Sequence, residues 1–335
     1  MTIIMLSKYF YPHIGGVETH VEKVSRELIK QGHKVTVVTT KHDEKLADVE
    51  TYQGIKIIRI PVSEKKAKIW ASILKYKSLF ADSDVVHCHD VFWWYMPLRA
   101  LLPAKPVYST FHGWEGDYPI PKKNLNARKI WEKLSTGNIC IGEYLSKYYG
   151  TKPNLVSYGG CDLPTSPLPI SAKNIKEIVV IGRLEKDLGM KEYLSALKQL
   201  KSQFSLKITF VGDGSFRKEA GKLGAVTGWV KDISPYLRRP ALVMASGYLT
   251  ILSAMVNLRP VFALYHNQLK KDYLTLFPGA RFMRVSGSTA ELVSQVKNAL
   301  KNTKSIDRMV AQAASFAKQQ TWEKVAKQYL KLWQK

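Results

Sequence analysis

Short apolar runs alternate with amphipathic runs along the whole chain, and this alternation restricts the fold more than any other feature. In the first half, strands are predicted at residues 3–6, 35–39, 85–88, 107–110, 139–141 and 155–157. Helical patterns separate most of these strands, for example at residues 17–30 and 91–102. Strands that alternate with helices are typical of βαβ units around a parallel sheet.

The same alternation starts again after a proline-rich segment at residues 163–170. Strands are predicted at 177–181, 207–211, 241–244 and 261–264, and helices at 190–203, 216–223, 289–302 and 322–333. The proline-rich segment is therefore expected to link two α/β domains. A ligand of such a fold binds beyond the carboxyl ends of the strands, so the expected site is the cleft between the domains.

The bulk composition limits the function classes. The 335 residues carry a formal net charge of +24, which implies an anionic partner such as nucleic acid, anionic lipid or a phosphorylated substrate. Three cysteines without a CxxC spacing predict buried thiols in a reducing compartment. The first residues show no signal-peptide pattern, so a cytoplasmic location is expected. Residues 241–258 are uncharged, but polar side chains interrupt them, which favours a buried strand and helix over a membrane span.

Two adjacent glycines, Gly15 and Gly16, stand between the first predicted strand and the first predicted helix. Glycine allows a backbone to approach a phosphate closely, and a helix amino terminus offers free N–H groups. An ordinary strand-to-helix turn has the same appearance, so the two glycines alone leave both interpretations open.

The residues around this pair carry a more specific signal. Residues 11–18, with the sequence YPHIGGVE, resemble the opening of the retaining glycosyltransferases of family four, which have the GT-B fold. Further stretches resemble the same family, in order, at 84–90, 109–113, 158–162, 182–185, 211–214, 253–261 and 321–326. The resemblance implies an α/β chain of two Rossmann-like domains facing across a cleft. It implies an acceptor-side domain at 1–163, a nucleotide-sugar-binding domain at 171–320, and a helix at about 321–335 that packs back on the first domain.

The resemblance also implies site residues. His112 is expected to face the donor sugar as the catalytic residue, and Arg183 to pair with the donor diphosphate. The implied donor-binding set is Gly15, Gly16, Arg183, Gly214, Trp229, Val230 and Ser253. The donor is expected to be a UDP- or GDP-type sugar. No metal and no other cofactor is expected, because fixed cations and N–H donors stabilise the charge on the leaving phosphate.

Three positions depart from the family pattern. The family carries a lysine five residues after the arginine, where this chain has Leu188, and Lys186 and Lys191 are the candidate substitutes. The family also carries two glutamates eight residues apart, where this chain has Ala245 and Ser253. The charged acceptors of a carboxylate are therefore missing. These departures leave open a catalytically impaired partner subunit that binds a nucleotide sugar.

Two other patterns are not expected to bind a metal. Asp82 and Asp84 precede a strand, which would place them at the wrong end of the sheet. His87 and His89 alternate on one strand and face the same side, but no third ligand is apparent.

Positive charge is concentrated in two stretches of the first domain. At residues 64–77, helical spacing separates several lysines from an apolar face that includes Trp70. The second stretch contains Lys122, Lys123, Arg128, Lys129 and Trp131. Basic residues beside tryptophan suit an anionic membrane surface, and the alternative is a helix packed on the sheet with its lysines in water. The residues expected at a membrane are Lys65, Lys66, Lys68, Trp70, Lys75 and Lys77.

Together these features predict a glycosyltransferase that moves a hexose-type sugar from a nucleotide-diphosphate sugar to a glycan or lipid-linked acceptor, with retention. The enzyme is expected on the inner face of the membrane as a peripheral protein. A sugar-nucleotide epimerase of the same fold is the alternative among enzymes. A nucleic-acid-binding protein is disfavoured because no nucleic-acid module is recognisable.

Overall fold

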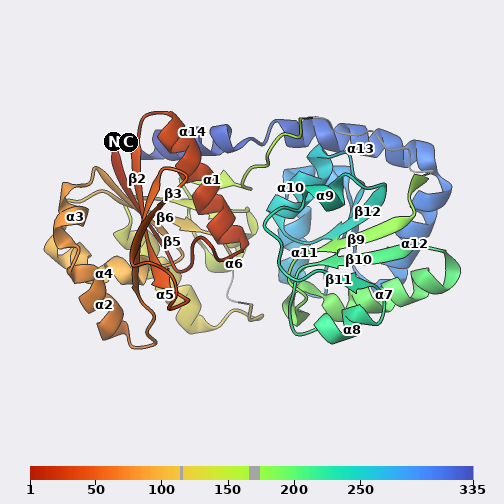
Figure 1. The fold of residues 1–335 in the computed structure, drawn as a ribbon, viewed down its shortest axis with the longest axis horizontal. Helices are drawn as coiled ribbons and strands as arrows, with labels where there is room; N and C mark the ends of the chain where they lie inside the picture. Colours follow the sequence, from red (N-terminus) through yellow and green to blue (C-terminus); the bar gives the residue numbers. More distant parts are fainter. Residues whose placement is uncertain (114–115, 166–173, 335) are drawn as a thin grey trace. The chain divides into compact units, whose positions relative to one another are not determined.

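The computed structural model describes residues 1–113, 116–165 and 174–334. The chain divides into two compact units, Met1–Ser157 with Trp322–Lys335, and Tyr158–Thr321. Each unit is a mostly parallel sheet covered by helices, as Figure 1 shows, which confirms the predicted α/β class. Residues 166–170 of the predicted linker lie outside the described residues.

The first unit contains an eight-stranded sheet in the order β3-β4-β2-β1-β5-β6-β7-β8. Only the β3–β4 pair is antiparallel among the pairings of this sheet in the described residues. Its central strands are buried along most of their length, because helices cover both faces of a parallel sheet. The strands are β1 (Thr2–Ser7), β2 (Lys34–Lys41), β3 (Val49–Tyr52), β4 (Ile55–Pro61), β5 (Val85–His89), β6 (Val107–Phe111), β7 (Gly137–Ile141) and β8 (Leu155–Ser157).

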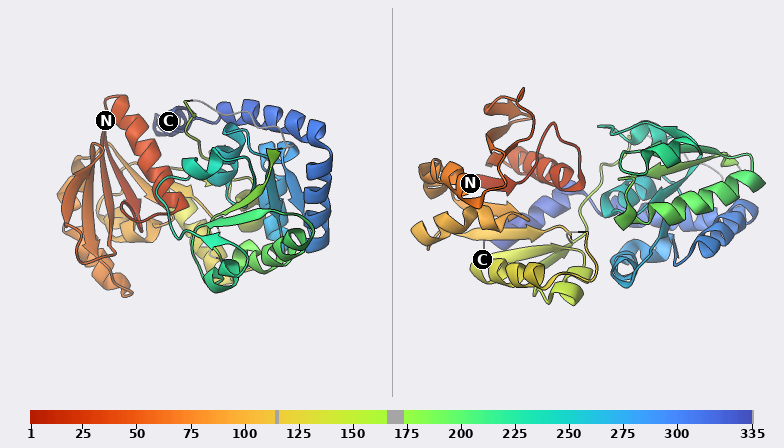
Figure 2. Two further views of the ribbon diagram at one scale, coloured as in Figure 1. Left: turned by 45° about the vertical axis from the view of Figure 1, so that its right-hand side comes forward. Right: turned by 90° about the horizontal axis from the view of Figure 1, so that it is seen from below.

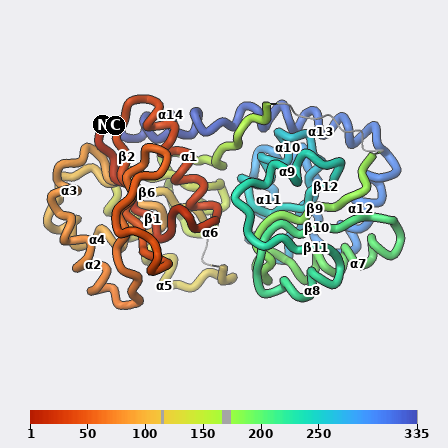
Figure 3. The backbone as a smooth tube through the Cα atoms, in the orientation of Figure 1, coloured from red at the N-terminus to blue at the C-terminus, as the bar shows by residue number. Residues whose placement is uncertain are grey.

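The helices of the first unit present apolar stripes to this sheet. The carboxyl-terminal helix α14 (Trp322–Trp333) belongs to this unit and lies beside α1, as the tube in Figure 3 and the two views in Figure 2 show. It buries Trp322, Tyr329 and Trp333 among other residues, so one of its faces is part of the first core. The other helices are α1 (Gly16–Lys30), α2 (Lys66–Leu74), α3 (Lys77–Asp82), α4 (Phe92–Leu101), α5 (Lys122–Leu134) and α6 (Tyr144–Tyr149).

The second unit contains a six-stranded parallel sheet in the order β11-β10-β9-β12-β13-β14. Its strands are β9 (Glu177–Ile181), β10 (Lys207–Val211), β11 (Ala225–Val226), β12 (Ala241–Ala245), β13 (Val261–Leu264) and β14 (Arg284–Ser286). Its helices are η2 (Lys186–Leu188), α7 (Met190–Gln203), α8 (Arg217–Gly221), α9 (Ser234–Leu237), α10 (Tyr248–Val256), α11 (Gln268–Thr275), η3 (Pro278–Phe282), α12 (Thr289–Lys301) and α13 (Thr303–Lys318).

Several sequence expectations can be compared with these elements. The uncharged stretch at 241–258 is the buried strand β12 followed by the buried helix α10, as predicted. All three cysteines are free and buried, also as predicted. Within the described ranges, no helix combines the length and apolar character needed to cross a bilayer. The β3–β4 hairpin and helix α13 were not predicted.

Candidate functional site

Three loops meet at the carboxyl edge of the second sheet. The loop after β9 is joined to the loop after β10 by two backbone bonds, from Gly182 N to Val211 O (3.0 Å) and from Leu184 N to Asp213 O (2.8 Å). Gly212 in turn forms a bridge with Gly228. This approach requires glycine, because a Cβ on Gly212 would overlap the Gly182 carbonyl. The stretches predicted to border the phosphates and the base therefore lie together at one edge.

Arg183 stands on the first of these loops with its side chain 53% exposed. Its guanidinium donates to the Asp187 carboxylate at 2.8 Å. This pair fixes the direction of the guanidinium, but an incoming phosphate has to compete with the carboxylate for the same donors. Because about half of its side chain is exposed, Arg183 is accessible to an anion.

The other donor-side residues of the second unit occupy different surroundings. Trp229 is 47% exposed, and Gly214 and Val230 are half-buried. Ser253 is half-buried on α10, and Ala245 is buried at the end of β12.

The two candidate substitute lysines both point toward solvent. Lys186 is exposed on η2, and Lys191 is exposed on α7. Leu188, at the position of the missing lysine, is half-buried between them.

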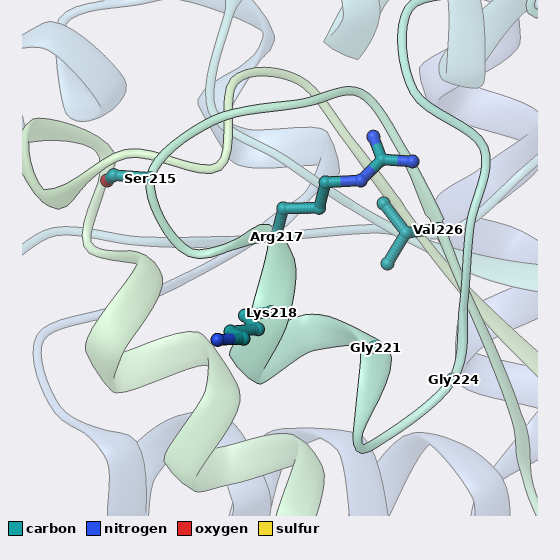
Figure 4. Close-up of a pocket in the computed structure, with 6 residues that line it drawn as sticks. All are labelled: Ser215, Arg217, Lys218, Gly221, Gly224 and Val226. Atoms are coloured by element: carbon teal, nitrogen blue, oxygen red, sulfur yellow. The ribbon is translucent and has the colours of Figure 1, made fainter.

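A hollow of about 550 Å³ opens beside these loops (Figure 4). Arg217 and Lys218 line it from α8, and Val226 lines it from β11. Arg217 is paired with Asp213 of the glycine-rich turn at 2.7 Å. The hollow therefore adjoins the predicted nucleotide segment and carries positive charge, with Ser215, Gly221 and Gly224 completing its lining.

In the first unit, the predicted phosphate turn holds a carboxylate. The Glu18 carboxyl group lies directly against Gly15, where an added Cβ would overlap it. Glu18 also pairs with His13 at 2.8 Å, and burial raises the pKa of its carboxyl group. Gly16 is exposed, and no Cβ contact constrains it. An anion at this turn would meet Glu18 first, a neighbour that the sequence pattern did not predict.

Buried histidines form a hydrogen-bonded chain in the first unit that the sequence did not predict. Trp333 Nε1 donates to His87 Nδ1 (3.1 Å), and His87 Nε2 is 2.7 Å from Thr110 Oγ1. Thr110 Oγ1 is 2.7 Å from the Tyr329 hydroxyl, which is 2.9 Å from His20 Nε2. Burial lowers the pKa of both histidines to about 3, so they are neutral. Because the indole is only a donor and His87 is neutral, His87 accepts at Nδ1 and donates from Nε2 to Thr110.

His112 lies next to this chain, at the carboxyl end of β6. Its Nε2 is 2.9 Å from His89 Nδ1, and its backbone N–H donates to the Asp90 carboxylate at 3.1 Å. Burial and the neighbouring histidines hold the pKa of both imidazoles well below the usual range. His112 is therefore a neutral hydrogen-bonding group rather than a cationic acid.

Arg128 does not lie on the surface, contrary to the prediction that it belongs to a basic surface. It is 2% exposed, stacks on Phe111 and Tyr149, and donates to the Gly113 carbonyl at 3.0 Å. Aromatic rings stabilise a buried guanidinium through their π faces. The residue thus supports the segment that carries His112.

Trp70 is also less available than the sequence suggested. Its indole N–H donates to the Trp93 carbonyl at 2.8 Å, and its side chain is half-buried. Ile69 and Ile73 of the same helix are buried in the first core. The lysines of this stretch (Lys65, Lys66, Lys68, Lys75 and Lys77) are exposed.

The two patterns discounted as metal sites can now be placed. Asp84 accepts the backbone N–H of Thr2 at 2.6 Å, at the amino end of the sheet. In the part of the chain that the structure describes, no three His, Cys, Asp or Glu side chains are grouped to hold a metal ion.

Residues 14–151 match the family model described as Glycosyltransferase Family 4. One subunit of the human phosphatidylinositol N-acetylglucosaminyltransferase is 30% identical, over 64% of this chain and 48% of its own length. The GDP-mannose:cellobiosyl-diphosphopolyprenol alpha-mannosyltransferase of Xanthomonas campestris is 32% identical, over 34% of this chain and 31% of its own. The chain spans less than two thirds of the length of these curated relatives.

The fold can be compared over nearly the whole chain. Anabaena HepE, solved in complex with UDP and glucose, has a TM-score of 0.76 at 15% identity and covers 98% of this chain and 97% of its own. At that identity the likeness concerns the fold alone, and the fold is GT-B, as the sequence predicted. The matched residues 14–151 lie within the first unit, so the similarity to Glycosyltransferase Family 4 concerns that unit, and the likeness over the whole chain concerns the fold.

Proposed function

We propose that the chain transfers a sugar from a UDP- or GDP-type sugar to a lipid-linked glycan acceptor, with retention of anomeric configuration. The main support for this proposal is the family match at residues 14–151. The second unit of the same chain adds an exposed Arg183 at the glycine-rich carboxyl edge of its sheet. Two of the relatives are named for acceptors that contain lipid, phosphatidylinositol and a diphosphopolyprenol. These names support a lipid-linked acceptor.

For sugar transfer, the protein has to stabilise the charge on the leaving diphosphate and hold the donor sugar in position. Breaking the sugar–phosphate bond leaves negative charge on the diphosphate and produces an oxocarbenium-like sugar. Arg183 would exchange its bond to Asp187 for bonds to the diphosphate, where a guanidinium binds two oxygens at once. His112, being neutral, would hydrogen-bond the donor sugar without adding positive charge beside the developing cation.

A second candidate is a partner subunit that binds the nucleotide sugar without transferring it. Ala245 and Ser253 favour it, because neither provides a carboxylate at the edge of the second sheet. The name of the human relative also describes a subunit. Binding of a nucleotide sugar without any transferred product would support this candidate over the enzyme.

Transfer is expected to proceed without a divalent metal, because Arg183 and backbone N–H groups would supply the charge stabilisation that a metal otherwise gives. The test incubates the protein with UDP- and GDP-sugars and a lipid extract, with and without EDTA, and detects glycosylated lipid by mass spectrometry. Equal product in both samples is expected. Product that is lost with EDTA and restored by magnesium or manganese would contradict this prediction.

We further propose that α2 and its flanks dock on an anionic membrane surface from the cytoplasm. Lys65, Lys66 and Lys68 are exposed, and the apolar Val62 and Leu74 near them are 59% and 37% exposed. Because Trp70 is bonded to Trp93, the attraction is expected to be mainly electrostatic. Each basic residue near such a surface contributes about 1 kcal/mol.

Liposome co-sedimentation tests this docking. Changing Lys65, Lys66 and Lys68 together to Ser is expected to weaken binding to anionic liposomes by about 100-fold, from roughly 3 kcal/mol of lost attraction. The matched control changes Lys301, Lys304 and Lys318, three exposed lysines of the second unit, and is expected to bind as the wild type. Equal sedimentation with neutral and anionic liposomes would refute the proposal.

A further inference from the structure

A lysine is buried in the second unit close to the loop that carries Arg183. Lys270, on α11, is 1% exposed. Its ammonium donates to the Ser246 carbonyl at 2.7 Å and lies 3.9 Å from the centre of the Tyr273 ring. Lysine is rarely buried so completely, because the removal of an ammonium group from water is strongly unfavourable. The packing around Lys270 therefore carries an unusual cost.

The sheet register places this ammonium at the carboxyl edge. Ala245 of β12 pairs with Ile181 of β9, so Ser246 follows β12 where Gly182 and Arg183 follow β9. The Ser246 carbonyl that holds the ammonium therefore belongs to the same edge as Arg183. The loop after β13 also reaches this edge. His266 of that loop lies close to Gly189, since a Cβ added to Gly189 would be 3.4 Å from the imidazole Nδ1.

The charged groups around Lys270 have opposite effects on the pKa of its ammonium group. Burial lowers the pKa of its ammonium from 10.5 to about 7, Asp187 opposes this change, and Arg183 adds to it. His266 also interacts electrostatically with Lys270, and burial lowers the pKa of its imidazole. The tyrosines that pack here, Tyr193, Tyr248 and Tyr273, are buried as well. Near neutral pH, Lys270 is therefore divided between its charged and uncharged forms.

We propose that a diphosphate bound at Arg183 draws a proton onto Lys270, so that the anion is held by two positive charges, one exposed and one buried. The inference rests on the proposed function, since it takes the diphosphate of the donor as the anion. Arg183 leaves Asp187 to bind the phosphate, and the added negative charge favours the ammonium form of Lys270. Lys270 is then a positioning residue that acts on the anion through space.

The proposal predicts a dependence of nucleotide affinity on pH. Well below the pKa of free Lys270 the ammonium is already charged, and binding takes up a proton chiefly between that pKa and the higher pKa of the bound state. If the bound anion raises that pKa from about 7 to about 8, the affinity for UDP falls about fivefold between pH 7 and pH 9. Burial lowers the pKa of the His266 imidazole, so in the free protein this group titrates at lower pH than Lys270.

Calorimetry of UDP and GDP binding tests the proposal at pH 8, in two buffers with different enthalpies of ionisation. The wild type is expected to take up a substantial fraction of one proton per nucleotide bound. Lys270→Met is expected to take up none and to lose the dependence on pH. The matched control is Lys198→Met, which removes an exposed lysine of the same unit and is expected to keep the proton uptake.

The possible results separate this inference from the proposed function. Nucleotide binding by the wild type without proton uptake would overturn the role of Lys270 and leave the function in place. If Lys270→Met does not fold, the two-buffer measurement on the wild type still decides. Failure of the folded wild type to bind either nucleotide would overturn the proposed function and the inference together.

Discussion

Replacing Gly212 by alanine is expected to lower the free energy of unfolding of the second unit by more than about 3 kcal/mol. Gly212 has a φ of 148°, which L side chains rarely adopt, and an added Cβ would overlap the Gly182 carbonyl. Gly212 directly follows β10 and Gly182 directly follows β9, and these two strands are paired, so the two glycines cannot easily move apart. Urea denaturation followed by circular dichroism measures the change.

The matched control for this substitution is Gly221→Ala. Gly221 lies at the end of α8, and a Cβ there meets no atom within 4 Å. The free energy of unfolding of the Gly221→Ala protein is expected to stay within about 0.5 kcal/mol of the wild-type value. A slight increase is also consistent, because alanine lowers the entropy of the unfolded chain. Wild-type stability for Gly212→Ala would mean that the loops after β9 and β10 are not packed as described.

Arg183→Ala is expected to weaken the binding of a nucleoside diphosphate by about 10- to 100-fold. A hydrogen bond to a charged group contributes about 1.5–3 kcal/mol, and this guanidinium is exposed at the edge where the phosphates are proposed to bind. Isothermal titration calorimetry with UDP and GDP gives the dissociation constants directly.

Arg26→Ala is the control for the loss of an exposed arginine. Arg26 pairs with Glu22 four residues earlier, as Arg183 pairs with Asp187 four residues later, but it lies in the second half of α1, beyond the glycine turn. The Arg26→Ala protein is expected to bind the nucleotide with the affinity of the wild type. An unchanged affinity in folded Arg183→Ala would remove this residue from the proposed site.

The sequence missed the short strands β11 and β14 of the second sheet and predicted its four longer strands, which are buried on both faces. Such strands appear as continuous apolar runs between turns, and the predicted ranges 177–181, 207–211 and 261–264 coincide with β9, β10 and β13. The β3–β4 hairpin was missed because β3 lies at the sheet edge and alternates between exposed and half-buried residues. Its turn uses Gln53 and Gly54, both with positive φ, where Asn-Gly would have been the recognisable signal.

The candidate site shows a different limit. The loops that carry Gly15, His112 and Arg183 were predictable from local motifs. The partners that alter their chemistry come from distant segments, as when Tyr329 and Trp333 of α14 order the buried histidines. Local spacing cannot reveal such contacts, because tertiary packing alone creates them.

Lysine and arginine were the residues most easily misjudged. Arg128 lies in a basic helical stretch and Lys270 in the equally polar sequence QLKKDY, so both suggest solvated side chains. Both are instead almost fully buried, and each lies against aromatic rings. Aromatic rings and a carbonyl acceptor stabilise the buried charge in both cases. For Arg128, the Gly113 carbonyl and the Tyr149 ring are far away in the sequence, so local spacing gives no sign of them.

Binding of a nucleotide-activated sugar is the property on which the proposed function depends, and a thermal-shift screen with UDP-glucose, UDP-N-acetylglucosamine and GDP-mannose decides it. A ligand that binds only the folded state at 100 times its dissociation constant adds about 2.7 kcal/mol of apparent stability. At least one of these sugars is expected to raise the melting temperature by several degrees, and the matching nucleoside diphosphate is expected to do the same. A folded protein whose melting temperature stays constant with every UDP- and GDP-sugar at millimolar concentration would contradict nucleotide-sugar binding.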